Sequence, residues 1–360
     1  MLKIERIRLH AGQMPVDLEF SYGSVRKFGF VMAEIHAGGI VGLGEGLAAR
    51  AEDCAALAQS LIGRDALLLD QLIPAQPEFT WQGVVTREMF SMALHDLAAR
   101  AAGWPLHVLL GGARRNEIPL MACLFPKSPE QAAETARRFV GQGYRALKVK
   151  LFGEAARDAE IIRAVRSELP EGFLQADANC GYKRFEEAAD ALPLFQDAGL
   201  DAIEDPADVP LEEYCWLMEA MPRPKIILDS PTRGHRAIHE AALRRCCDAV
   251  NLHPNMQGTF SEIRDRAAIL RLSGVDVEIG GTGYTGVGAF AHMHVAAVHG
   301  MEYPFGEIGG WQDHGMPAST AAEPLPIRNG MAILPDGPGH GGRLNPETLA
   351  KYAQVTEITR

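Results

Sequence analysis

Three carboxylate residues recur at nearly regular intervals in the middle of the chain. Asp177, Glu204 and Asp229 each follow a short apolar run, at intervals of 27 residues (177 to 204) and 25 residues (204 to 229). Each interval is about the length of one strand–helix unit, so the three side chains would meet around the mouth of a barrel. Converging carboxylates repel one another unless a cation joins them, and oxygen ligands suit Mg²⁺. The spacing predicts a Mg²⁺ site, although any one of these residues alone is more typical of a helix cap or a loop.

A pair of lysines precedes these carboxylates. Lys148 and Lys150 are two residues apart in an apolar run, so on a strand both side chains face the same way. Neighbouring positive charges favour the loss of a proton from one ammonium group. A lysine can become a base near neutral pH in this way. Taken alone, the pair is more typical of two ordinary lysines on a solvated edge strand.

Other polar residues follow apolar runs elsewhere in the chain. Asn179 lies two residues after Asp177, as a candidate substrate or supporting contact. His253 ends the sixth predicted strand, and it could face Lys150 across a bound substrate because second and sixth barrel strands lie roughly opposite. A structural hydrogen-bonding role is the alternative for this histidine. Glu307, after the eighth predicted strand, is a candidate substrate-binding carboxylate or a residue with no such role.

Together these residues favour one reaction, the removal of the proton next to a substrate carboxylate. Lys150 would take this α-proton, and Lys148 would lower the cost of doing so. A bound Mg²⁺ and nearby positive charges would stabilise the enediolate that forms.

The elements that must position these residues alternate along the chain from about residue 118. Apolar runs predict strands near 118–124, 146–151, 173–177, 201–204, 225–229, 248–253, 275–280 and 303–307. Helical patterns lie between most of them, for example at 154–168, 184–198 and 259–273. Such alternation predicts a parallel sheet, and this many units predict a (β/α) barrel. A doubly wound open sheet is the alternative, but no GxGxxG motif follows an early strand.

The part of the chain before residue 118 has a different pattern. Strands are predicted near 2–10, 28–37 and 40–45, and residues 50–112 are predicted to be helical. The stretch 10–27 is polar and contains glycine, so it is expected to be a long connection or a lid. The proline-containing tail from about 320 is expected to leave the barrel and pack on this N-terminal unit.

Composition narrows the class of protein. A net charge of −11 argues against nucleic acid or an anionic membrane as a partner, and leaves a small-molecule substrate. The six cysteines form no CxxC pair, which is typical of a reduced, cytoplasmic protein. The N-terminus alternates like a strand rather than a signal peptide, and no apolar run is long enough to cross a bilayer.

The motifs together resemble the mandelate racemase/muconate lactonizing enzyme group of the enolase superfamily. They are Gly42-Leu43-Gly44-Glu45, Ala93-Leu94-His95-Asp96-Leu97, Leu109-Leu110-Gly111-Gly112, Lys148-Val149-Lys150, Asp177-Ala178-Asn179, Glu204-Asp205-Pro206 and Asp229-Ser230. The resemblance implies an α/β fold class. It implies a (β/α)7β TIM-like barrel over residues 118–321 and an α+β capping domain over residues 1–117, completed by about 322–360.

The resemblance also implies roles for individual residues. It implies Mg²⁺ on the three carboxylates, Lys150 as the base with Lys148 as its partner, and specificity from capping loops near 15–30. Tyr22 and Arg26 lie in that region as candidate substrate contacts, and Arg26 could equally be solvated. A homo-oligomer is usual in this group. The ligand set leans towards the muconate lactonizing subgroup, except that His253 stands where a lysine is usual.

Three functions agree with these residues. A racemase or epimerase of an amino-acid-like or hydroxy acid would use Lys150 and His253 on opposite faces of the substrate. An acid-sugar or hydroxy-acid dehydratase, or a cycloisomerase, would use Lys150 to form the enediolate, and in a dehydratase His253 could protonate the leaving hydroxide. An inactive binding protein on the same fold is the alternative outside enzymes.

Overall fold

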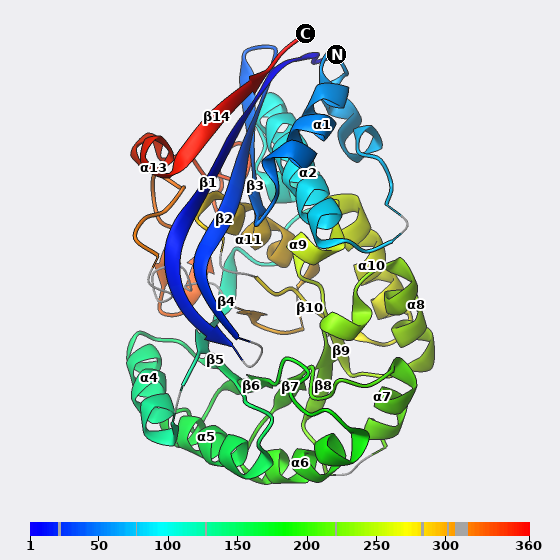
Figure 1. Ribbon diagram of the computed structural model, residues 1–360, viewed down its shortest axis with the longest axis vertical. Coiled ribbons are helices and arrows are strands. Elements are labelled where there is room, and N and C mark those ends of the chain that lie inside the picture. Colours follow the sequence, from blue (N-terminus) through cyan, green and yellow to red (C-terminus); the bar gives the residue numbers. More distant parts are fainter. Residues whose placement is uncertain are drawn as a thin grey trace.

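The computed structural model describes residues 1–20, 23–76, 78–126, 128–219, 222–281, 284–300, 302–306 and 316–360. In this part of the chain the main strands form two sheets (Figure 1). One is antiparallel, in the order β14-β1-β2-β3, and the other runs in parallel from β4 to β10. Strand β11 pairs with β4, and a bridge between Gly280 and Gly306 joins the two ends of the parallel sheet. The parallel strands therefore close into a barrel, which confirms the predicted fold class.

The barrel strands and their outer helices alternate in chain order. The strands are β4 (Glu117–Leu124), β5 (Ala146–Lys150), β6 (Phe173–Asp177), β7 (Ala202–Glu204), β8 (Lys225–Leu228), β9 (Ala249–Asn251), β10 (Asp276–Glu278) and β11 (Phe305–Gly306). The helices are α4 (Pro129–Gly141), α5 (Ala155–Glu168), α6 (Phe185–Asp197), α7 (Leu211–Leu217), α8 (His235–Arg244), α10 (Phe260–Leu272) and α11 (Val287–His299). A short 3₁₀ turn, η2 (Ser230–Thr232), follows β8, and the one-turn helix α9 (Pro254–Gln257) follows β9.

The barrel interior is apolar at one level and acidic at the next. Ala202, Ile227 and Ala249 pack together inside the barrel, each on a neighbouring strand. Because side chains two residues apart on a strand face the same side, Glu204 and Asp229 point into the barrel one level above. Strand pairing thus brings the carboxylates to the carboxyl ends of adjacent strands, as the sequence predicts.

The antiparallel sheet and its helices form the capping part of the molecule. Its strands are β1 (Ile4–Phe20), β2 (Gly23–Ala37), β3 (Ile40–Leu47) and β14 (Ala353–Ile358). Its helical elements are α1 (Ala51–Leu61), η1 (Ala66–Leu72), α2 (Trp81–Ala102), α3 (Leu106–Leu109) and α13 (Pro346–Tyr352). None of the helices in the described part of the chain has the length and apolar character that crossing a membrane requires.

The stretch 10–27 differs from the predicted connection, because most of it continues the hairpin of β1 and β2. Antiparallel pairing extends along both strands as far as Phe20 and Gly23, and Figure 1 shows the hairpin curving away from the rest of its sheet. Its apolar side chains explain the difference: Met14 and Phe30 are buried in one cluster, and Val16 packs against Met316 in another.

The C-terminal tail contacts both parts of the molecule. Strand β14 pairs with β1, so this end of the tail packs on the N-terminal sheet as expected. Before that, β12 (Ile327–Arg328) and β13 (Met331–Ile333) form a hairpin, and β13 pairs antiparallel with the start of β4. The tail therefore adds to the barrel sheet before it leaves. The domain boundaries given above stay a prediction.

Helix α2 lies directly against β3, and glycines on that strand allow the close approach. A Cβ atom added at Gly44 would lie 2.1 Å from the carbonyl oxygen of Met89, and one added at Gly42 would lie 2.1 Å from that of Ala93. Both contacts involve backbone atoms of a buried helix, so no side-chain movement can relieve them.

We expect Gly44→Ala to destabilise the protein because the new methyl group must push α2 away from the sheet. Overpacking of this kind costs about 1–3 kcal/mol or more, which differential scanning calorimetry would detect as a lower Tm. Gly29→Ala is the matched control, because a Cβ there would have its nearest neighbour at 3.8 Å. An equal Tm for the two variants would contradict the packing described here.

Candidate active site

The two lysines of β5 and the carboxylates of β6 and β7 form one buried ionic cluster. Lys148 Nζ lies 2.6 Å from Glu204 Oε2 and 3.6 Å from Asp177 Oδ2. Lys150 Nζ lies 2.7 Å from the same oxygen of Asp177. Lys148 is completely buried, whereas the side chain of Lys150 is 12% exposed. Lys150 is therefore the lysine of the pair that is nearer to solvent and to an incoming molecule.

Asn179 supports the carboxylate of β6 from the following turn. Its backbone N–H donates to Asp177 Oδ1 over 2.8 Å, and its side-chain amide donates to Oδ2 over 3.1 Å. Asn179 adopts a positive φ of 45°, which asparagine tolerates better than most residues. The residue predicted as a substrate or supporting contact thus lies against a predicted metal ligand.

A group suited to a metal ion lies beside the lysines. Glu204, Asp229 and His253 each offer one ligand atom, and these atoms lie within 4.8 Å of one another. All three residues are buried, at 2%, 7% and 3% exposure. Two carboxylates with one imidazole suit a divalent cation. The predicted ligand Asp177 is not in this group, and the set Asp177, Glu204 and Asp229 stays a prediction.

The electrostatics of the cluster also favour a cation. Burial, against the lowering effect of Lys148, and the charges of Asp177 and Asp229 together raise the pKa of Glu204 to about 7. Burial also raises the pKa of Asp205 to about 7. Negative charge is crowded here, and a bound cation would relieve the repulsion.

Asp205 fixes the position of Asp229, although sequence reasoning gave it no role. Its two carboxylate oxygens accept hydrogen bonds from the backbone N–H groups of Asp229 and Ser230, each over 2.9 Å. Both oxygens are thus directed at the chain that carries Asp229. Asp205 directly follows Glu204, so the sequence alone does not show whether it would bind a metal ion or support a residue that does.

Two further residues that sequence reasoning missed lie inside the barrel. Gln175 donates through Nε2 to Glu204 Oε2 over 2.8 Å and to Glu278 Oε1 over 3.3 Å. Gln175 and Glu278 are both fully buried. The sequence signal for both is a polar residue in an apolar strand: Gln175 lies two residues before the end of β6, and Glu278 is the last residue of β10.

His253 is held against Asn251 at the end of β9. The amide nitrogen of Asn251 lies 3.1 Å from Glu204 Oε1, to which it donates, and 3.0 Å from His253 Nε2. A hydrogen bond donated by the Asn251 amide to Nε2 suits the tautomer that carries its proton on Nδ1. A Cβ atom at Gly280 would lie 2.7 Å from Nε2, so only glycine leaves room for the ring.

Three candidate substrate contacts remain: Arg26, Tyr22 and Glu307. Arg26 is exposed on β2, near the tip of the hairpin. Tyr22 and Glu307 lie outside the described residues. Roles for these three residues in substrate binding stay predictions.

Comparison with known protein families shows the family to which the chain belongs. Residues 3–111 match the family model described as the mandelate racemase / muconate lactonizing enzyme N-terminal domain. Residues 131–348 match the model described as enolase C-terminal domain-like. The chain belongs to the mandelate racemase/muconate lactonizing enzyme group of the enolase superfamily.

Relatives within the enolase superfamily extend over nearly the whole chain. An N-succinylamino acid racemase of Thermus thermophilus is 28% identical and aligns over 95% of each sequence. A chloromuconate cycloisomerase of Pseudomonas putida is 26% identical over 98% of this chain and 100% of its own. The muconate lactonizing enzyme of Pseudomonas fluorescens shares the fold, with a TM-score of 0.87 at 20% identity, over 98% of this chain and 100% of its own. The protein is therefore an enzyme of a superfamily whose members here are isomerases and lyases.

We expect Asp205→Asn to weaken divalent-cation binding because the amide cannot accept from both backbone N–H groups, so Asp229 shifts. Loss of a residue that orients a metal ligand typically lowers metal affinity roughly 10- to 100-fold, which titration calorimetry with Mg²⁺ would measure. Asp208→Asn is the control, because its ion pair with Lys183 is on the surface. Unchanged affinity in D205N would show that Asp229 either needs no such support or is not a ligand.

Proposed function

We propose that this enzyme is a Mg²⁺-dependent racemase or epimerase that removes the α-proton of a small carboxylic acid. The observation that carries the proposal is the ion pair of the partly accessible Lys150 with Asp177, beside the buried Lys148–Glu204 pair. Lys150 is then held at the barrel mouth, where its neutral amine would take a proton from an incoming molecule; a cation bound at Asp177 and the charge of Lys148 would favour that neutral form. Lys148 supplies positive charge that the burial of its side chain makes more effective.

A second proton-transfer group on the far side of the barrel supports racemisation. Lys150 ends β5 and His253 follows β9, which are separated around the ring by β6, β7 and β8. Two groups on opposite sides of a barrel would act on opposite faces of a substrate. One would remove the α-proton to leave an enediolate, and the other would return a proton to the other face.

Asp177, Glu204 and Asp229 are the proposed residues for Mg²⁺, with the imidazole of His253 close to two of them. A bound Mg²⁺ would supply positive charge to the substrate carboxylate while the α-proton is absent. The protein residues orient this site: Asn179 holds Asp177, Asp205 holds the chain at Asp229, and Gln175 and Asn251 hold Glu204.

Amino acids with an acylated nitrogen are the first substrates to test, because the relative from Thermus thermophilus is named an N-succinylamino acid racemase. Hydroxy acids are the next class. A cycloisomerase or dehydratase is the second candidate, supported by relatives named chloromuconate cycloisomerase and o-succinylbenzoate synthase. In a dehydratase, His253 would protonate the leaving hydroxide. A homo-oligomer is expected, as is usual in this group.

We expect the wild-type enzyme with Mg²⁺ in D₂O to exchange the α-proton of its substrate, and EDTA to abolish the exchange. Lys150→Ala should lower the exchange rate roughly 10²- to 10⁴-fold, the usual contribution of a general base. Mass spectrometry detects both the label and any loss of water, which would identify a dehydratase. Lys183→Ala is the control, on the exposed loop after β6. Full exchange in K150A would refute the assignment of the base.

We expect His253→Gln to abolish inversion while leaving exchange of the enantiomer whose proton faces Lys150. The glutamine keeps hydrogen bonding but cannot carry a proton at neutral pH. Chiral chromatography coupled to mass spectrometry separates the two effects. Racemisation at the wild-type rate in H253Q would exclude His253 as the second acid/base.

A further inference from the structure

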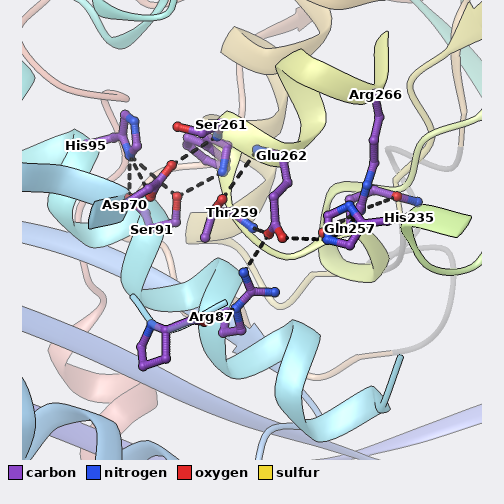
Figure 2. A network of polar contacts seen from close by, with 12 residues as sticks. Asp70, Arg87, Ser91, His95, His235, Gln257, Thr259, Ser261, Glu262 and Arg266 are labelled. Carbon is purple, nitrogen blue, oxygen red and sulfur yellow. Dashed lines mark hydrogen bonds and ion pairs between the residues drawn. The ribbon is translucent and has the colours of Figure 1, made fainter. Parts of the chain in front are cut away.

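The N-terminus of the barrel helix α10 is capped in part by side chains of the capping sheet's helices (Figure 2). The first N–H groups of a helix lack partners within it. The N–H of Phe260 donates to Ser91 Oγ on α2, and that of Ser261 donates to Asp70 Oδ2 on η1, each over 3.0 Å. Thr259 and Glu262 cap each other reciprocally. The start of α10 is thus fixed relative to α2 and η1.

A partly buried ion pair crosses the same boundary. Arg87 on α2 donates through Nη2 to Glu262 Oε2 over 2.8 Å and through Nε to the carbonyl oxygen of Pro74 over 2.9 Å. Glu262 also accepts from the N–H of Thr259 over 2.7 Å, and its other oxygen lies 3.0 Å from His235 Nε2. Arg87 is only 8% exposed. Removal of one partner would leave the other, a largely shielded charge, with only its remaining hydrogen bonds, which would loosen this segment locally.

The chain just before α10 packs on this ion pair. Gly258 has φ +98°, and a Cβ there would lie 2.4 Å from Glu262 Oε2 and 2.7 Å from Arg87 Nη1. Arg266, itself buried, donates to the backbone and side-chain oxygens of Gln257. Figure 2 shows Arg87, Glu262, Gln257 and Arg266 meeting around this segment. The backbone at Gln257 and Gly258 therefore has little freedom while both arginines are in place.

His253 is joined to this segment by a single helical turn. It is the residue before α9, and its carbonyl oxygen accepts from the N–H of Met256 over 2.9 Å. A shift at Gln257 and Gly258 would therefore be transmitted to His253 through a turn of four residues. Lys150, on β5, forms its ion pair with Asp177 inside the barrel, away from this network.

We propose that Arg87 and Glu262 are positioning residues, through which the capping part of the molecule sets the location of the His253 imidazole. The proposal rests on the proposed function for the role of His253, but not for the structural coupling. The Arg87–Glu262 pair acts on the side of the active site that carries His253. Its loss therefore slows proton transfer at His253 and spares proton transfer at Lys150.

The experiment compares Arg87→Met and Glu262→Gln with Arg87→Lys, which keeps the charge. Arg100→Met is the matched control, because Arg100 is on the same helix and pairs with Asp96 over 2.7 Å, away from α9 and α10. Hydrogen–deuterium exchange of the backbone, read by mass spectrometry, reports on residues 253–262 and on β5 and β6. Enantiomer-specific α-proton exchange reports on His253 and Lys150 separately.

We expect R87M and E262Q to raise backbone exchange in residues 253–262 and leave β5 and β6 unchanged. They should also slow α-proton removal at His253 by up to about 100-fold, because a misplacement of about 1 Å can cost that much, with little change at Lys150. R87K should restore much of the loss, and R100M should show neither effect.

Equal slowing at both residues, or unchanged backbone exchange in residues 253–262, would overturn the proposal. A wild-type enzyme that exchanges no α-proton would count against the proposed function alone, because the backbone measurement still decides the coupling between Arg87 and residues 253–262.

Discussion

The burial of several carboxylates in one barrel mouth is the constraint on which the rest of the structure depends. Moving a carboxylate out of water costs on the order of several kcal/mol unless partners compensate, and Asp177, Glu204 and Asp229 are at most 7% exposed. The lysines of β5 compensate for two of them. A backbone N–H group and an amide side chain add hydrogen bonds to the same two carboxylates, and Arg233 lies 3.6 Å from Asp229. A parallel barrel can provide this arrangement because each strand delivers one residue to the same level.

The two sides of the site are held in different ways. Lys148 and Lys150 belong to a strand that pairs on both sides, so their backbone is fixed by the barrel ladder itself. His253 lies beyond the end of β9, where strand pairing has stopped and a one-turn helix begins. Its backbone must be fixed by something other than the sheet. The contacts of α9 and α10 with α2 and η1 provide that support.

The sequence was informative where one residue type recurs once per structural unit. Strand positions and the carboxylates Asp177, Glu204 and Asp229 follow from that spacing, and the fold class does too. The hairpin through residues 10–27 did not follow, because its apolar residues pack on chain that is more than 250 residues away. The supporting role of Asp205 was missed because hydrogen bonds from backbone N–H groups produce no pattern in the spacing of residue types. The Arg87–Glu262 pair joins residues 175 apart, and ordinary charged residues on two helices give no sign of it.

The stiffness of histidine explains why such distant support matters here. A lysine has several rotatable bonds between backbone and nitrogen, so small errors in backbone position can be absorbed along the side chain. An imidazole has two, and the ring of His253 is further confined by Asn251 and by the lack of room at Gly280. Its reacting nitrogen therefore follows the backbone closely. A histidine in this place requires a backbone fixed on both sides, by β9 before it and by the Gln257–Gly258 segment after it.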